Sequence, residues 1–341
     1  MKLLVANNAA PFVRGGAELL ADRLVLELRR AGHEAELLRL PLGDTPEQIV
    51  DGMIAAATLT AVNVDRIIGL KFPAYLIPHH DVVVWLVHQL RQAYDPAPVG
   101  WPDDARLGEV KAAIHAADGA AFARAQRLYA ISPVVADRLQ RATGLHAEVL
   151  LTPPHAEVEY RTGPAGDYLL AHGRISDGKR QFLAIEAMVH ARPGYRLVVA
   201  GSPDSPESVQ RLEALVDRLG VRDRVQIIGR FLASDELLDL IAHCIGSVYL
   251  PLDEDSYGYV CYEAAMSGKP LITASDSGGT HTLVAEGVTG LIAEPDPLAL
   301  ATAFDLLALD LPRSAEMGLA ARDAARGLDL SWSRVVQELT R

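Results

Sequence analysis

Two carboxylates eight residues apart, Asp255 and Glu263, lie in a segment whose chemistry suits a polyhydroxyl ligand. The segment, residues 249–290, begins as an apolar run, turns acidic and continues into a helix-compatible stretch that ends at Gly268. A second apolar run then leads to a Ser-Gly-Gly turn. This order predicts a ligand site at the carboxyl end of a parallel sheet. Phosphate can bind to backbone N–H groups at the predicted helix start, which comprises Ser256, Tyr257, Gly258, Tyr259 and Val260.

Two cations, Arg174 and Lys179, follow His172-Gly173, which come directly after the predicted strand at 168–171. Arginine offers a planar bidentate fork and lysine a compact charge, so the pair can stabilise the negative charge that builds on a departing diphosphate. Fixed groups of this kind each contribute about 2.7–4 kcal/mol. The alternative is a solvated basic patch at a helix start, where the helix dipole disfavours cations. We expect Arg180 to be solvated.

Two features of the first half are weaker signals. The loop Arg14-Gly15-Gly16 follows the first predicted strand, and its glycines permit close backbone approach to a diphosphate or a sugar. It matches neither the dinucleotide fingerprint nor the P-loop, and Glu18 is expected to cap the following helix. His88 ends a predicted strand and can orient a hydroxyl or move its proton, although a structural histidine bonded to backbone is nearly as good an interpretation.

Over nearly its whole length, and most specifically from Asp167 to Glu294, the chain resembles the retaining GT-B glycosyltransferases. The likeness is greatest to the family 4-like members, which carry a Glu, seven residues and a second Glu. Here the match is Asp255, SYGYVCY and Glu263, with a first carboxylate that is one methylene shorter. The resemblance implies two Rossmann-like α/β domains whose parallel sheets face a cleft. It assigns the diphosphate to Arg174 and Lys179, the ribose hydroxyls to Glu263 and the donor-sugar hydroxyls to Asp255. It also implies donor contacts from Gly15, Gly16, Gly173, Gly229 and Arg230.

The resemblance implies retaining, metal-independent transfer of a sugar from a nucleotide-diphosphate sugar to a hydroxyl, with no cofactor. The acceptor would be a glycan, a lipid-linked molecule or a small molecule. Reading Asp253 and Asp255 as the metal-binding D-x-D of the GT-A architecture is disfavoured, because these acids precede a helix in the second domain. Two alternatives stay open, a nucleotide-sugar epimerase of the same fold and a non-catalytic subunit that binds nucleotide sugar. The shortened acid Asp255, and Thr282 where the family commonly has Glu, support the second.

Length and apolar patterning predict an α/β chain with two domains, since 341 residues exceed a single core. We place the first domain at 1–155, the second at 156–325 and a last segment at 326–341, which the resemblance packs onto the first domain. The best linker covers 152–166. Predicted strands are 3–6, 36–40, 66–69, 82–87, 127–131, 148–151, 168–171, 196–200, 225–228, 247–250, 270–273 and 290–293. Predicted helices include 17–30, 105–125 and 332–339.

Composition limits the kinds of partner that the protein is expected to bind. A net charge of −12 argues against nucleic acid. The only cysteines, Cys244 and Cys261, lack the spacing of a metal site or a disulfide framework and are expected to be reduced and buried in a cytosolic protein. We expect no signal peptide and no membrane span, which leaves peripheral contact with the cytoplasmic face of a membrane open. The nucleobase, the sugar, the acceptor and the oligomeric state are not determined by the sequence.

Overall fold

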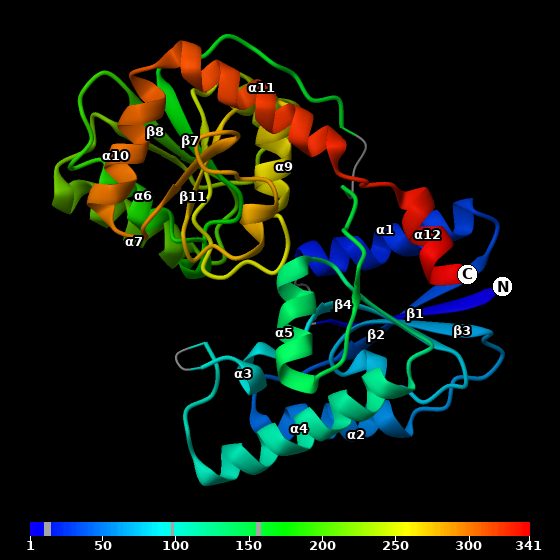
Figure 1. Ribbon diagram of the computed structural model, residues 1–341. Coiled ribbons are helices and arrows are strands. Elements are labelled where there is room, and N and C mark those ends of the chain that lie inside the picture. Colours follow the sequence, from blue (N-terminus) through cyan, green and yellow to red (C-terminus); the bar gives the residue numbers. More distant parts are fainter. Residues whose placement is uncertain (10–14, 97–98, 155–157) are drawn as a thin grey trace. The chain divides into compact units, whose positions relative to one another are not determined.

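The computed structural model describes residues 1–9, 15–96, 99–154 and 158–341 (Figure 1). The chain forms two compact units, Met1–Ala156 with Leu330–Arg341, and Glu157–Asp329. Each unit contains a six-stranded parallel sheet, and the predicted class of two Rossmann-like α/β domains is confirmed.

The first unit is built on the strand order β2-β1-β3-β4-β5-β6. The strands are β1 (Lys2–Ala9), β2 (Glu34–Pro41), β3 (Arg66–Lys71), β4 (Val82–His88), β5 (Arg127–Ala130) and β6 (Glu148–Val149). The helices are α1 (Gly16–Arg30), α2 (Pro46–Thr58), the short 3₁₀ helix η1 (Ala74–Leu76), α3 (Arg91–Tyr94), α4 (Ala105–Arg124), α5 (Pro133–Thr143) and α12 (Trp332–Thr340). Figure 1 shows α1 and α12 on one face of this sheet and α2 and α4 on the other.

Hydrogen bonds at both ends of the last helix, α12, attach it to the first unit. The Trp332 indole N–H donates to the Pro154 carbonyl at 2.9 Å, and its ring meets Trp85 edge-on, with centroids 6.4 Å apart. Arg66 donates to the carbonyl oxygens of Leu339 and Arg341 at 3.0 and 2.9 Å. The apolar side of α12 therefore completes the core of this unit, with Val335 and Leu339 buried.

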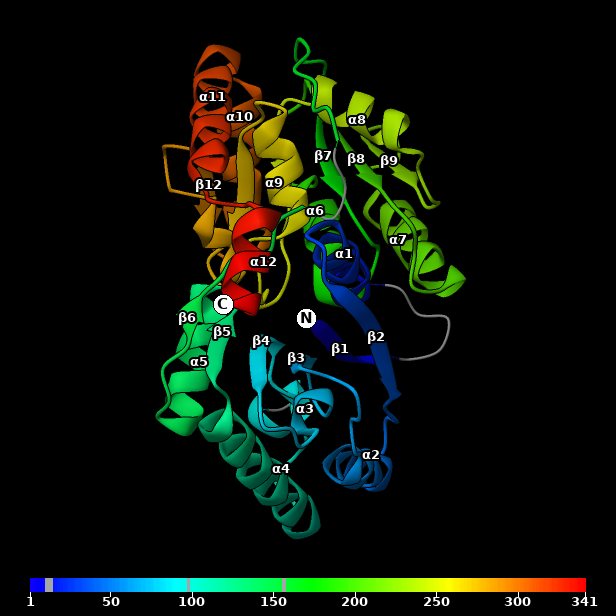
Figure 2. The same cartoon turned by 90° about the vertical axis from the view of Figure 1, so that its right-hand side faces the viewer.

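The second unit has the strand order β12-β11-β10-β7-β8-β9. Its strands are β7 (Tyr168–His172), β8 (Arg196–Ala200), β9 (Val225–Ile228), β10 (Ser247–Val248), β11 (Leu271–Ala274) and β12 (Gly290–Ala293). Its helices are the 3₁₀ helix η2 (Asp177–Lys179), α6 (Gln181–Ala187), α7 (Pro206–Leu219), α8 (Ser234–His243), α9 (Tyr259–Met266), the 3₁₀ helix η3 (Gly279–Thr282), α10 (Pro297–Ala308) and α11 (Leu311–Gly327). Figure 2 shows β7, β8 and β9 side by side.

The chain reverses its direction across the second sheet beside β7. From β7 it proceeds through β8 to β9, and then returns to β10 on the other side of β7. Because crossover connections are right-handed, this reversal sends later helices to the opposite face of the sheet. Loops that leave β7 and β10 diverge at such a point, which is where open α/β sheets bind ligands.

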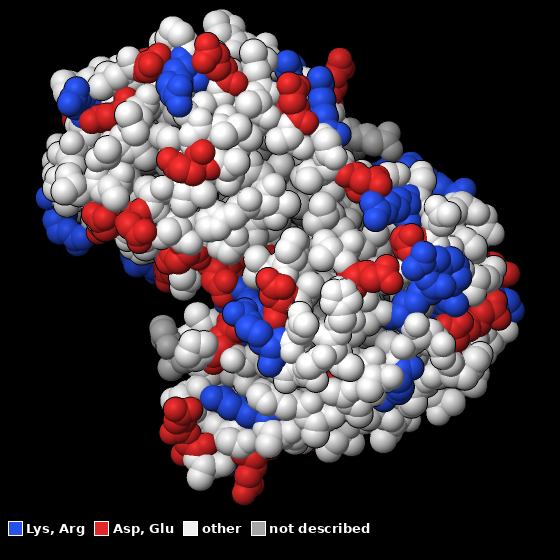
Figure 3. All heavy atoms as spheres, viewed as in Figure 1, with Lys and Arg blue, Asp and Glu red and all other residues white. Residues whose placement is uncertain are grey.

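Burial on both faces explains why apolar runs located the strands. Residues 82–87 of β4 and 271–274 of β11 are all buried, as expected for parallel strands covered by helices on both sides. All the predicted strands are present, although some of their ends differ. The last two residues of the strand predicted at 148–151 lie outside β6, and the last two of the strand predicted at 247–250 lie outside β10. No helix in the described residues is long and apolar enough to cross a bilayer. On the face seen in Figure 3, basic and acidic side chains are interspersed.

Candidate functional site

The candidate site occupies three loops at the carboxyl edge of the second sheet, after β7, β10 and β11. The strand β10 lies between β7 and β11, so these loops start next to one another. The loop after β7 carries the cations, the loop after β10 carries the acids, and the loop after β11 carries the Ser-Gly-Gly turn.

The Ser-Gly-Gly turn supports the acidic loop through backbone contacts. The Asp253 N–H donates to the Asp276 carbonyl at 2.9 Å, and the Gly279 N–H donates to the Glu254 carbonyl at 2.7 Å. Gly278 has a φ of 60°, and a Cβ there would lie 2.6 Å from the Glu254 carbonyl oxygen. Only glycine fits this close approach, so the turn fixes the course of the acidic backbone.

Glu263 lies in α9 and is held by a histidine that the sequence analysis did not assign. His172, the last residue of β7, is 2% exposed, and its Nε2 lies 3.2 Å from Glu263 Oε2. Its Nδ1 lies 3.4 Å from the Ser247 hydroxyl of β10. This row of side chains orients the carboxylate of Glu263, which retains 25% side-chain exposure. Asp255 is half-buried in the preceding loop.

Lys179 reaches the acidic loop. Its ammonium group forms an ion pair with Glu254 and donates to the Tyr249 hydroxyl at 2.7 Å. The Tyr249 hydroxyl in turn donates to Glu254 Oε2 at 2.7 Å. Burial, together with the Glu254 carboxylate, raises the pKa of Tyr249, so the phenol stays protonated and remains a donor. Glu254 was not among the predicted site residues. Its partner Lys179 lies 75 positions away in the chain, so the local sequence around Glu254 does not indicate the contact.

Arg174 has a different acidic partner. Its guanidinium lies 3.3 Å from Asp204, and both side chains are about half exposed. The Gln181 amide donates to the Arg174 carbonyl at 2.9 Å, which ties the loop after β7 to the first turn of α6. Each of the two predicted diphosphate-binding cations is thus paired with a carboxylate in this structure.

The prediction that Arg180 is solvated is wrong. Arg180 is 9% exposed, and its guanidinium binds both carboxylate oxygens of Asp276 at 2.8 and 2.6 Å. It also donates to the carbonyl oxygens of Leu250 and Pro251. Arg180 has a left-handed backbone, with φ of 52°, and its buried side chain contacts the loop after β10. This arginine therefore joins the three loops.

The helix start lies slightly later than the predicted row of N–H groups. Gly258, with φ of 75°, precedes the first residue of α9, Tyr259, so Ser256 and Tyr257 belong to the loop. Gly173 has a φ of 109°, and a Cβ there would lie 3.0 Å from Val260 Cγ2. The loop after β7 therefore lies against the first turn of α9, where a helix favours phosphate.

The predicted base-contacting turn after β9 is shaped by packing and by an ion pair. A Cβ at Gly229 would lie 2.6 Å from the Val209 side chain, so α7 closes over this glycine. Arg230 is exposed and pairs with Glu236, with one N–O distance of 2.9 Å. The next residue, Phe231, is 79% exposed.

In the first unit, the predicted residues lie at the end of a strand and at the start of a helix. His88 ends β4, and its Nδ1 lies 2.7 Å from the Gln89 carbonyl oxygen. Gly15 caps α1 and Gly16 is its first residue. The Gly15 N–H donates to Glu18 at 2.8 Å, which confirms Glu18 as a capping residue, whereas Arg14 lies outside the described residues.

The remaining reactive groups do not form a second chemical centre within the described ranges. Cys244 and Cys261 are buried and unpaired with each other, as predicted, and burial raises the pKa of each thiol. No three His, Cys, Asp or Glu side chains among the described residues gather into a group that could hold a metal ion.

Comparison with solved structures places this fold among the GT-B glycosyltransferases. Sucrose-phosphate synthase from Thermosynechococcus elongatus has a TM-score of 0.78 and 17% identity, with 99% of this chain and 96% of that chain covered. Anabaena HepE, in complex with UDP and glucose, has a TM-score of 0.72 and 19% identity, with 99% and 98% covered. At such identities the likeness defines the fold.

The sequence of the second unit is similar to that of known glycosyltransferases. Residues 161–324, which make up most of the second unit, match the family model described as Glycosyl transferases group 1. D-inositol 3-phosphate glycosyltransferase of Xylanimonas cellulosilytica is 33% identical over 165 residues, covering 46% of this chain and 38% of that protein. Glycogen synthase of Mycobacterium tuberculosis is 33% identical over 187 residues, covering 53% and 43%. The chain spans less than half the length of these curated relatives.

Proposed function

We propose that this chain is a retaining glycosyltransferase that moves a sugar from a nucleotide-diphosphate donor to a hydroxyl acceptor. The observation that carries the proposal is the meeting of cationic and acidic loops around Glu263 at the carboxyl edge of β7 and β10. The family match over residues 161–324 and a fold neighbour in complex with UDP and glucose support it.

In this proposal each side chain of the site binds a different part of the donor. Glu263 accepts hydrogen bonds from the ribose hydroxyls, in the orientation that His172 gives it. Asp255 accepts hydrogen bonds from the sugar. Arg174 and Lys179 bind the diphosphate, whose charge replaces that of their present partners, Asp204 and Glu254.

The same groups account for the reaction. The bond between the sugar anomeric carbon and the diphosphate oxygen breaks while the acceptor oxygen bonds to that carbon on the same face. The departing phosphate takes up the acceptor proton, and Arg174 and Lys179 stabilise the charge left on the diphosphate. These two side chains supply the positive charge that a divalent metal supplies elsewhere, so the proposed reaction is metal-independent.

Other predicted residues have supporting roles in the proposal. The main chain at Gly229-Arg230 contacts the nucleobase, and the start of α9 receives a phosphate oxygen. In the first unit, Gly15 and Gly16 contact the donor through their backbone, and His88 contacts the donor sugar or lies near the acceptor. His88 can orient a hydroxyl or help to move its proton.

A transfer assay tests the proposal directly. The chain is incubated with UDP-, GDP- and ADP-linked hexoses and with acceptors suggested by the relatives, D-inositol 3-phosphate and glycogen oligosaccharides. We expect one donor to be consumed, with the anomeric configuration of the product, read by NMR, equal to that of the donor. Inversion would contradict the retaining mechanism. Isomerisation of the donor without transfer would favour an epimerase, and binding without turnover a non-catalytic subunit.

A further inference from the structure

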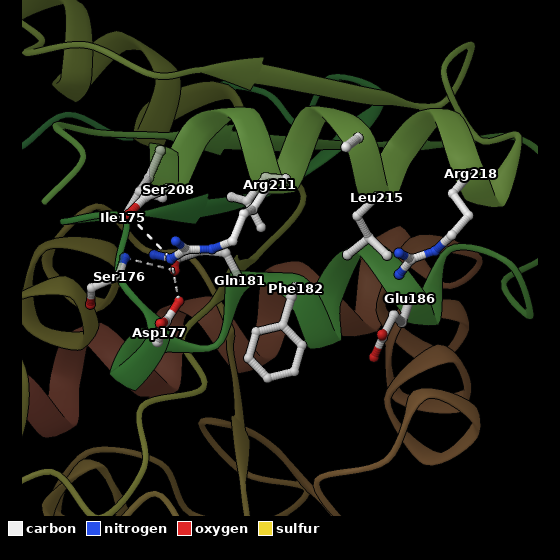
Figure 4. A pocket seen from close by; sticks show the side chains of 12 residues that line it. Ile175, Ser176, Asp177, Gln181, Phe182, Glu186, Ser208, Arg211, Leu215 and Arg218 are labelled. Carbon is white, nitrogen blue, oxygen red and sulfur yellow. Dashed lines mark hydrogen bonds and ion pairs between the residues drawn. The ribbon is translucent and has the colours of Figure 1, made fainter. Parts of the chain in front are cut away.

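We propose that a groove between α6 and α7 is a binding site for a neutral saccharide, separate from the donor site. The groove has a volume of about 390 Å³, at the small end of the range for ligand pockets. Its walls are one face of each helix, and its end is closed by residues 175–177 of the loop after β7 (Figure 4).

Each end of the groove carries one arginine and one carboxylate. At the end near the loop, Arg211 of α7 donates to Asp177 at 2.8 Å. At the far end, the groove is lined by Arg218 of α7 and Glu186 of α6 (Figure 4). Planar guanidinium and carboxylate groups present paired donors and acceptors, which match the adjacent hydroxyls of a sugar ring.

The charge balance argues for a neutral ligand. Two arginines and two carboxylates line the groove, so no excess positive charge is available for a phosphate or another anion. The remaining polar residues, Ser176, Gln181 and Ser208, are uncharged. A polyhydroxyl molecule can use all of these groups without burying an unpaired charge.

The middle of the groove is apolar. The ring of Phe182 and the side chain of Leu215 lie between the two charged ends (Figure 4). Phe182 is only partly buried, so a ring face or edge is available to the C–H face of a pyranose. An apolar platform between two polar ends is the arrangement expected for a molecule with one apolar face and a polar rim.

This groove is distinct from the donor site but adjoins it. Arg174, Lys179, Asp255 and Glu263 do not line it. Gln181, whose amide donates to the Arg174 carbonyl, lies between the two sites. The groove can therefore be altered at Arg218 and Glu186 without changing a residue proposed to touch the donor, and its test is independent of the proposed transfer reaction.

The experiment measures saccharide binding by the whole chain. Immobilised α- and β-linked oligosaccharides of glucose, mannose and galactose are screened, and the best binder is titrated by calorimetry. We expect Arg218→Ala and Glu186→Gln each to weaken saccharide binding about tenfold and to leave nucleotide diphosphate binding unchanged. Arg222→Ala is the matched control, because Arg222 pairs with Glu213 and Asp217 and does not line the groove.

Three outcomes would overturn the proposal. One is that none of these oligosaccharides binds. Another is that the best binder keeps its affinity in Arg218→Ala and Glu186→Gln. The third comes from titrating glucose 6-phosphate and inorganic phosphate in parallel with glucose. If either anion binds at Arg218 more tightly than the uncharged sugars, the groove is an anion site.

Discussion

Replacing His172 with leucine is expected to weaken ribonucleotide binding through Glu263. His172 is 2% exposed and 3.2 Å from Glu263 Oε2, so the substitution removes a buried partner of that carboxylate. A hydrogen bond to a charged group contributes about 1.5–3 kcal/mol. Because 25% of the Glu263 side chain is exposed, water can replace part of the interaction, and the lower value applies. We therefore expect a loss of about tenfold in affinity.

The assay compares two ligands in three proteins. Calorimetry is performed with the tightest-binding nucleoside diphosphate among UDP, GDP and ADP, and with its 2′,3′-dideoxy form. Only the first can use a carboxylate that holds ribose, so only its affinity should fall in His172→Leu. His172→Gln keeps an N–H donor near Nε2 and should restore most of the loss. His243→Leu is a control, since His243 lies at the exposed end of α8.

An equal loss for both ligands would refute this reasoning. It would mean that His172 supports the site generally, as a buried side chain between β7 and β10, and does not act through the ribose. Thermal unfolding of each variant, measured alongside, separates a loss of binding from a loss of folded protein.

Four further predictions concern charge. Lys179→Ala should lower turnover roughly 10²–10³-fold, the effect of losing one charge-stabilising group, and unchanged kcat in the folded variant would remove Lys179 from the site. Glu254→Gln should tighten nucleoside diphosphate binding about fivefold in calorimetry, since it removes the carboxylate that competes for Lys179. Activity should survive EDTA, and loss that Mn²⁺ restores would support the D-x-D interpretation. Burial raises the pKa of Asp118 to about 7 from 3.8, so the folded state holds this proton more tightly and its contribution to stability declines as pH rises from 3.8 to 7. Between pH 5.5 and 8.5 the free energy of unfolding of the wild type, measured in urea, should fall by about 2 kcal/mol relative to that of Asp118→Asn. If the two free energies depend on pH in the same way, the pKa of Asp118 is not raised in the folded protein.

Local sequence pattern was sufficient for the fold because parallel strands are buried on both faces. Apolar runs such as 82–87 therefore locate strands without ambiguity, and the glycine turn at 277–280 marks a close backbone approach that the structure contains. Strand ends are less well determined. The apolar run at 247–250 continues past the last ladder pair at Val248, because burial extends beyond the hydrogen-bonded strand.

The partners of the site residues could not be predicted in the same way. Glu254 and Asp276 meet their cations, Lys179 and Arg180, only through the order of strands in the sheet. In the sequence, Arg180 is one more charged residue at a helix start, whereas in the structure its guanidinium is buried against Asp276. His172 is likewise one of many residues at a strand end. Its contact with Glu263 depends on how α9 packs, which the local sequence does not show.

Calorimetry of Asp255→Asn and Glu263→Gln tests the central claim, that these carboxylates divide a nucleotide-sugar donor between them. Each variant and the wild type are titrated with a nucleoside diphosphate and with the corresponding nucleotide sugar. Glu263→Gln should weaken both ligands by roughly 1–3 kcal/mol, because ribose is common to both. Asp255→Asn should leave the bare diphosphate nearly unchanged and weaken the nucleotide sugar. If Asp255→Asn weakens the bare diphosphate as much as Glu263→Gln does, the division of the donor between the two carboxylates is wrong.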